Sequence, residues 1–154
     1  MELPKTINKL WHILLADDDN SDRFFFEKAL KEITIQTKLT TVEDGEQLLN
    51  YLKKNSNHLP DVIFLDLNMP RKNGNECLSE IKSDEKLKHI PIVIYSTSLY
   101  EDIANILYQN GAHYYLQKCD LKDLPAYIQK ALTLLSENPG QPSKDKFILN
   151  TIHY

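Results

Sequence analysis

The feature that most constrains this chain is a regular alternation of short apolar runs with amphipathic segments. The runs have the length of buried strands, and the segments between them repeat apolar residues every three or four positions, as helices do. We predict five strands, at residues 12–16, 37–42, 62–65, 90–95 and 113–116. We predict five helices from the apolar stripes Phe26–Ile33, Leu48–Leu52, Glu76–Ser83, Leu99–Leu107 and Leu124–Leu135.

This alternation indicates the fold class. Parallel strands need crossover connections, which helices provide, and helices on both faces bury the sheet. We therefore expect an α/β fold with a doubly wound, five-stranded parallel sheet. Such sheets bind ligands outside the carboxyl ends of their strands.

Composition excludes several classes of protein. Among the 154 residues, 42% are hydrophobic and 26% are charged, and the net charge of −4 disfavours a nucleic-acid surface. No apolar run approaches the roughly 20 residues that span a bilayer, and the run near the N-terminus is too short for a secretory signal. The two cysteines, Cys77 and Cys119, form no disulfide framework. We expect a cytoplasmic protein that does not bind membranes or nucleic acid.

Polar residues follow four of the five predicted strands. Three aspartates, Asp17–Asp19, come after the first, and Asp66 comes directly after the third, with Asn68 two positions later. Ser96–Ser98 follow the fourth strand, and Lys118 follows the fifth. Because the carboxyl ends of parallel strands meet at one edge, we expect these groups to share a crevice.

Such a set of groups suits phosphoryl transfer. Crowded carboxylates repel one another unless a cation compensates, and Mg²⁺ is held by one or two carboxylates with a phosphoryl oxygen. A carboxylate can also act as a nucleophile and form an aspartyl-phosphate. We expect Asp66 to be the nucleophile, Asp17 and Asp18 to bind Mg²⁺, and Ser96 and Lys118 to contact the phosphoryl oxygens.

Each residue alone also has a simpler interpretation. Asp17–Asp19, Ser96 and Thr97 are good helix caps, because their side chains accept hydrogen bonds from free backbone amides. Asp66 fits a turn, and Lys118 fits a solvated surface. Their joint position at the ends of four strands favours the functional interpretation.

The residues also carry a family resemblance. Residues 10–136 resemble the receiver domain of two-component response regulators, through ILLADDD, VIFLDLNMPRKNG, IPIVIYSTS, NGAHYYLQK and the last amphipathic helix. The resemblance implies a flavodoxin-like strand order, 2-1-3-4-5, and phosphorylation at Asp66. It implies a metal site made by Asp17, Asp18, Asp66 and the backbone carbonyl of Asn68, a phosphate contact from Lys118, and a switch made by Ser96 and Tyr115.

The same resemblance implies how the protein would signal. A histidine kinase or a phosphotransfer protein would donate a phosphoryl group from phosphohistidine, and Tyr115 would move inward as Ser96 approaches the phosphoryl group. A surface formed by the fourth helix, the fifth strand and the fifth helix would then contact a downstream protein or a second copy in a homodimer. The protein would assist its own phosphorylation without being a conventional turnover enzyme.

The C-terminal part sets the expected domain organisation. We expect a receiver domain at residues 1–138 and a tail at 139–154, with no output domain. The tail is rich in Pro, Gly and Ser, which is typical of a loop or a disordered segment, although Phe147–Leu149 could dock on the domain.

Two residues depart from the family pattern. Cys119 follows Lys118 where receivers usually have a proline, often after a cis peptide, so the loop could be trans or strained. Cys119 could also be a redox thiol, although a plain loop cysteine is the simpler interpretation. Thr97 stands where the family more often has alanine or glycine, and its side chain would narrow the phosphoryl site.

Two other functions fit the same residues less well. A phosphatase or phosphotransferase of the haloacid dehalogenase type also uses a strand-end aspartate, Mg²⁺, a hydroxyl and a lysine. That class needs a second aspartate two residues after the nucleophile, where this chain has Asn68. An interaction module that is never phosphorylated is the third alternative.

Overall fold

The computed structural model describes residues 9–150 and contains a five-stranded parallel sheet in the order β2-β1-β3-β4-β5. This architecture confirms the predicted fold class and strand order. The strands are β1 (Trp11–Ala16), β2 (Thr37–Val42), β3 (Val62–Leu65), β4 (Ile92–Ser96) and β5 (Tyr114–Gln117).

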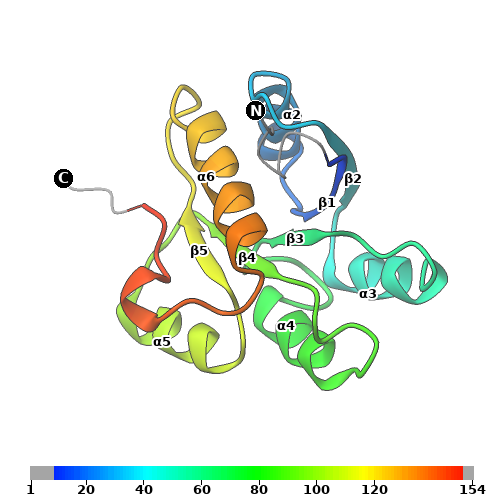
Figure 1. Cartoon of the computed structure of the whole chain (residues 1–154). Helices are drawn as coiled ribbons and strands as arrows, with labels where there is room; N and C mark the ends of the chain where they lie inside the picture. The colour runs from blue at the N-terminus through cyan, green and yellow to red at the C-terminus, as the bar shows by residue number, and fades with distance from the viewer. Residues whose placement is uncertain (1–8, 151–154) are drawn as a thin grey trace.

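Helices cover both faces of the sheet (Figure 1). They are α2 (Asn20–Leu30), α3 (Gly45–Lys54), α4 (Gly74–Ser83), α5 (Glu101–Gln109) and α6 (Leu124–Glu137), followed by the short 3-10 helix η1 (Lys144–Lys146). Buried residues of α3, α4 and α5 pack on one face, and those of α2 and α6 pack on the other. The result is a three-layer sandwich with two separate cores.

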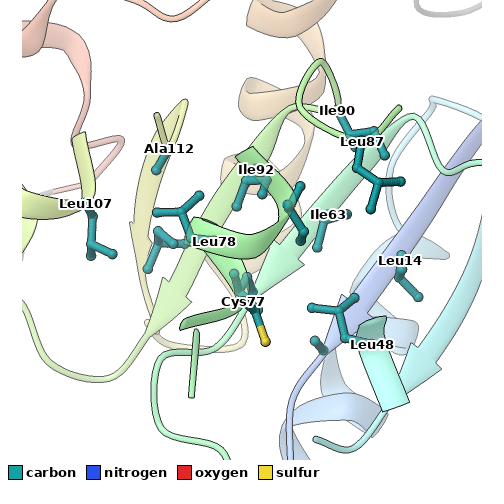
Figure 2. Packing of buried hydrophobic residues seen from close by; sticks show 14 of the residues in the cluster. Leu14, Leu48, Ile63, Cys77, Leu78, Leu87, Ile90, Ile92, Leu107 and Ala112 are labelled. Carbon is teal, nitrogen blue, oxygen red and sulfur yellow. The ribbon is translucent and has the colours of Figure 1, made fainter. Parts of the chain in front are cut away.

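The core on the α3–α4–α5 side is built from aliphatic side chains of alternate strand positions (Figure 2). Leu14 of β1, Ile63 of β3 and Ile92 of β4 point toward Leu48 of α3 and Leu78 of α4. Neighbouring strand residues such as Ile13 and Val93 belong to the opposite core, because successive side chains of a strand point to opposite faces. Burial on both faces explains why the strands read as continuous apolar runs.

Several predicted boundaries differ from the observed ones: β1 begins one residue earlier, β5 lies one residue later, and α4 begins two residues earlier, at Gly74. Two further differences have a clear local cause. The first helix ends at Leu30, so Ile33 lies outside it, in a stretch of β-branched residues that favour an extended chain. The fourth strand begins at Ile92 instead of residue 90, because Pro91 has no amide hydrogen for the ladder and contributes only its carbonyl, which accepts from the Ile63 amide.

The predicted stripe of the helix after the fourth strand was also partly wrong. The helix begins at Glu101, after Leu99, and its buried residues are Ala104 and Leu107. Ile103 and Ile106 are 42% and 48% exposed. Gly111 lies just after this helix with φ +101°, as expected of a residue that ends a helix in the left-handed region.

The C-terminal segment, residues 139–150, folds back on the domain. In Figure 1 it passes beside α5 and then runs next to β5, at the edge of the sheet. Phe147 and Leu149 are buried, in the α5-side and the α6-side core respectively, so docking of Phe147–Leu149 is confirmed. The division at residue 138 stays a prediction, and residues 1–8 and 151–154 of the two predicted ranges lie outside the described part.

None of the helices within residues 9–150 has the length and apolar character needed to span a bilayer.

Candidate functional site

The residues that follow the strands meet at the carboxyl edge of the sheet. Ligand atoms of Asp17, Asp18 and Asp66 all lie within 4.8 Å of one another. Asp66 is held beside β1 by its amide, which donates to the Ala16 carbonyl (3.0 Å). Lys118 is held beside β4 in the same way, since its amide donates to the Ser96 carbonyl (2.8 Å). Parallel pairing therefore gathers groups that are far apart in the sequence.

The three consecutive aspartates have different tasks. Asp19 is the N-cap of α2, and its carboxylate accepts from the Asp22 amide (2.9 Å). Asp17 is fully buried, and its carboxylate accepts from the Asp19 amide (2.9 Å). Asp18 is exposed at the mouth of the site. Of the three aspartates, only Asp19 caps α2. The other two, Asp17 and Asp18, are available for other roles.

Lys118 is the cation of the site. Its ammonium lies 2.8 Å from Asp17 Oδ2, 2.7 Å from Asp22 Oδ2 and 3.5 Å from Asp66 Oδ2. The Asp17 and Asp66 side chains are almost completely buried, and that of Lys118 is largely so. Buried charges of opposite sign stabilise one another only when they are paired in this way.

Asp22 and Arg23 complete the site, and we did not predict either residue from the sequence. Asp22 pairs with Lys118, and Arg23 Nη1 donates to the Asp17 carbonyl (2.7 Å). Both lie in the first turn of α2, which starts at the carboxyl edge of β1. The order strand, loop, helix was therefore a usable signal, because the first turn after such a strand faces the same edge.

The loop after β3 fits closely against the helix that follows. Asn73 and Glu76 form a capping box at the start of α4, and the Gly74 amide donates to the Leu67 carbonyl (2.9 Å). A Cβ at position 74 would clash with the Asp66 carbonyl oxygen and lie 2.8 Å from Leu67 Cα. Glycine at this position allows the loop to fold tightly around the backbone of Asp66.

Burial dominates the electrostatics of Asp66. Burial raises the pKa of its carboxyl to about 6, and the charges of Asp17 and Asp18 add to this effect, whereas Lys118 and the Asn68 amide oppose it. Burial alone would lower the pKa of Lys118, but hydrogen bonds to Asp17 and Asp22 hold that pKa above its ordinary value. One ammonium thus compensates only part of the crowded negative charge.

The donor set fits a hard divalent cation. Three carboxylates that approach within 4.8 Å offer oxygen atoms only, which Mg²⁺ and Mn²⁺ prefer. Asn68 is exposed, and its backbone amide donates to Asp66 Oδ1 (3.3 Å). The excess negative charge of the three carboxylates favours the binding of a cation at this position.

Ser96 and Tyr115 lie on the neighbouring strands β4 and β5. Ser96 is buried, and its Oγ has no hydrogen-bond partner within residues 9–150. Tyr115 is only 1% exposed, and its hydroxyl donates to the Ser98 carbonyl. Its neighbour Tyr114 is buried on the opposite face, as alternation along a strand requires. Thr97 is exposed.

The Lys118–Cys119 peptide is trans, since the described residues contain no cis peptide bond. Cys119 is half-buried, and burial, with the nearby Asp123 and Asp120, raises the pKa of its thiol. A raised pKa disfavours the thiolate, so these surroundings do not suit a redox thiol and agree with a plain loop cysteine.

A comparison with family models matches residues 13–129 to the response regulator receiver domain. The response regulator Rcp1 of Synechocystis is 37% identical over 122 residues, which make up 76% of this chain and 83% of Rcp1. The probable methanogenesis regulatory protein FilR2 of Methanothrix harundinacea is 33% identical, over 77% of this chain and 79% of FilR2.

Solved structures give a matching result. The Mn²⁺-bound form of Rcp1 superposes with a TM-score of 0.73 at 35% identity, over 86% of this chain and 99% of that one. The phosphorylated cyanobacterial phytochrome response regulator RcpA has a TM-score of 0.73 at 34% identity, over 86% and 97% of the two chains.

Proposed function

Because this chain belongs to the response regulator receiver family, we propose that Asp66 is the aspartate that accepts a phosphoryl group. The observation that carries this assignment is the position of its buried carboxylate, next to Asp17 and Asp18 and 3.5 Å from the ammonium of Lys118. Among the clustered acids, Asp17 is fully enclosed and Asp18 is exposed. Asp66 directly follows β3, which pairs with β4, the strand that ends at Ser96.

The chain's own residues then have distinct roles in the transfer. A carboxylate oxygen of Asp66 attacks phosphorus, an O–P bond forms, and the N–P bond of the donor phosphohistidine breaks, leaving neutral or reprotonated imidazole on the donor. Lys118 neutralises charge on the transferring oxygens. The Ser96 hydroxyl, which has no partner within residues 9–150, donates to a phosphoryl oxygen.

We assign the metal site to Asp17, Asp18, Asp66 and the backbone carbonyl of Asn68, with Mg²⁺ as the ion. When bound, Mg²⁺ supplies positive charge against the phosphoryl oxygens. Asp18 is the most accessible of the three clustered carboxylates and would offer the ion a ligand on the solvent side of the site. The ion would balance the negative charge that the single ammonium of Lys118 leaves uncompensated on the three clustered acids.

The donor would be a histidine kinase or a phosphotransfer protein met in the cytoplasm. Large apolar side chains are exposed in the two segments that supply Asp22 and Lys118, namely Phe24 of α2 and Leu121, three residues after Lys118. An apolar rim of this kind next to a charged site suits a protein donor, which must exclude water from the transferring group. A small phosphodonor does not need that contact.

The output surface would be the face formed by α5, β5 and α6. Signalling would occur through contact of this face with a downstream protein or with a second copy. Residues 147–150 now form part of that face, because they lie along β5. A partner that binds there therefore contacts the C-terminal segment as well.

Incubation with Mg²⁺ and acetyl phosphate tests the assignment and separates the three candidate functions. We expect one acyl-phosphate per chain in the wild type and none in Asp66→Asn. Repeated turnover of varied phosphoesters would favour a phosphatase of the haloacid dehalogenase type. Absence of labelling at any donor concentration, in a folded protein, would favour an interaction module that is never phosphorylated.

A further inference from the structure

The C-terminal segment is held by hydrogen bonds to α5, to the loop between α5 and β5, and to α6. The Tyr108 hydroxyl of α5 donates to the Pro142 carbonyl (2.7 Å), and Gln141 Nε2 donates to the Ala112 carbonyl (2.8 Å). Lys130 of α6 donates to the Leu149 carbonyl (3.2 Å). These contacts place residues 141–149 across the edge of the sheet, with the chain fixed at both ends.

Backbone pairing with β5 is the closest part of this contact. The Tyr115 amide donates to the Phe147 carbonyl (3.0 Å), and the Leu149 amide donates to the Tyr115 carbonyl (2.9 Å). Asn150 extends the pairing through its side chain. Its Oδ1 accepts from the backbone amide of Gln117 (2.8 Å), and its Nδ2 donates to the backbone carbonyl of Gln117 (2.9 Å). The segment therefore pairs with backbone N–H and C=O groups on the outer edge of β5, which would otherwise lack partners there.

Phe147 lies against the Tyr115 ring. The two ring centroids are 6.3 Å apart at an interplanar angle of 77°, and a second edge contact joins Phe147 to Tyr108 at 5.3 Å. Phe147 is 2% exposed. Its ring and its backbone fill the space beside β5, so Tyr115 cannot turn out toward solvent while the segment is docked.

Tyr115 connects this contact to the phosphorylation site. Its hydroxyl donates to the carbonyl of Ser98, two residues after Ser96. Ser96 in turn ends β4, beside the strand that leads into Asp66. A continuous set of contacts thus runs from Phe147 through Tyr115 to Ser98, in the loop that directly follows Ser96.

We propose that Phe147 is a positioning residue for phosphorylation: by filling the outer side of β5 it holds Tyr115 inward, in the position that suits a phosphorylated Asp66. The inference rests on the proposed function of Asp66, Ser96 and Tyr115. Because coupling between two sites is reciprocal, docking of the segment favours phosphorylation, and phosphorylation favours docking.

The first test is the rate of Asp66 labelling by acetyl phosphate with Mg²⁺. Phe147→Ala is expected to slow labelling about tenfold, because a smaller fraction of the molecules would hold Tyr115 in the position that suits phosphorylation. Phe147→Leu, which keeps an apolar side chain there, should restore most of the rate. Ile148→Ala is the matched control, because Ile148 is 38% exposed in the same segment, and it should label like the wild type.

The second test is hydrogen exchange of the Leu149 amide, which pairs with Tyr115. Phosphorylation should slow this exchange several-fold in the wild type, whereas a segment with only a structural role would exchange at the same rate in both states. Asn150→Ala, which removes the Gln117 pairing and no core ring, should slow labelling in the same direction if Phe147→Ala does not fold.

The outcomes separate the two proposals. A wild type that labels at Asp66, together with Phe147→Ala or Asn150→Ala labelling at the same rate, would overturn the inference alone. Unchanged Leu149 exchange on phosphorylation would also overturn it. A folded wild type that is not labelled would overturn the proposed function and the inference with it.

Discussion

The ammonium of Lys118 lies 3.5 Å from the carboxylate of Asp66, although 52 residues separate them in the chain. The same ammonium is closer to Asp17 and Asp22, which hold it between α2 and the end of β5. Asp17 and Asp22 thus position the Lys118 ammonium so that it also lies close to Asp66. An arrangement of this kind leaves the cation close to whatever binds at Asp66.

Replacing Lys118 should therefore slow the chemistry. Lys118→Ala is expected to slow Asp66 labelling by acetyl phosphate about a hundredfold, because a charge stabiliser aimed at the transferring oxygens is lost. Lys122→Ala, an exposed lysine of the same loop, is the control and should label normally. Labelling of Lys118→Ala at the wild-type rate would show that the lysine only balances Asp17 and Asp22.

Replacing Asp18 should weaken the metal. Asp18→Asn is expected to lower Mg²⁺ affinity by at least about tenfold in titration calorimetry, since a carboxylate ligand is lost from a three-acid site. Without metal the thermal midpoint should not fall, because the change also removes repulsion among the acids. Asp120→Asn, which changes an exposed acid after β5, should bind Mg²⁺ normally, and equal weakening in both variants would argue against a local site.

Gly74 should tolerate no side chain. Gly74→Ala is expected to reduce the free energy of unfolding by about 1–3 kcal/mol in urea denaturation, because the Cβ would clash with the Asp66 carbonyl and Leu67 must shift. Labelling of Asp66 should fall in the same variant. Gly140→Ala has room, with only Asn138 Oδ1 at 3.3 Å, and a similar loss there would mean that backbone clash is not the cause.

His113 should make the fold sensitive to acid. Burial lowers the pKa of its imidazole to about 4, and Lys82 adds to this effect, so the ring is neutral when its Nδ1 accepts from the Ile92 amide (3.4 Å). The folded pKa lies below the ordinary value of 6.5, so the stability is complete above pH 6.5 and is lost as the pH falls toward 4.

We expect protonation of His113 to lower the free energy of unfolding by about 2 kcal/mol when the pH falls from 7 to 5. The raised pKa of Asp66 acts in the opposite direction, since its protonation favours the folded state as the pH falls through about 6. The measurement is therefore the difference in urea stability between the wild type and His113→Asn at both pH values. An equal pH slope in the two proteins would contradict the account.

The sequence predicted those features that topology alone decides. Asp17, Asp66 and Lys118 each follow a strand and Ser96 ends one, and parallel pairing leaves only one edge for them. The last residue of α2 and the first residue of β4 were less predictable. Low helix propensity of the β-branched residues after Leu30 decides the former, and Pro91 decides the latter. Asp22 was missed since its role depends on how far the Lys118 side chain reaches, which no pattern in the sequence shows.

The C-terminal segment was the least predictable part. A Pro/Gly/Ser-rich composition favours a loop, and three apolar residues, Phe147–Leu149, are too few to establish a period. Burial of Phe147 and Leu149 depends on the open edge of β5 and on the Asn150 side chain, which pairs with Gln117. Tertiary contacts of this kind override local composition.

Mapping the phosphorylated residue tests the central claim most directly. The protein is labelled with acetyl phosphate and Mg²⁺, the acyl-phosphate is reduced with borohydride to homoserine, and the modified peptide is sequenced by mass spectrometry. We predict that the modification lies at residue 66 alone and disappears in Asp66→Asn. Modification at Asp17 or Asp18, or continued labelling of Asp66→Asn, would contradict the account.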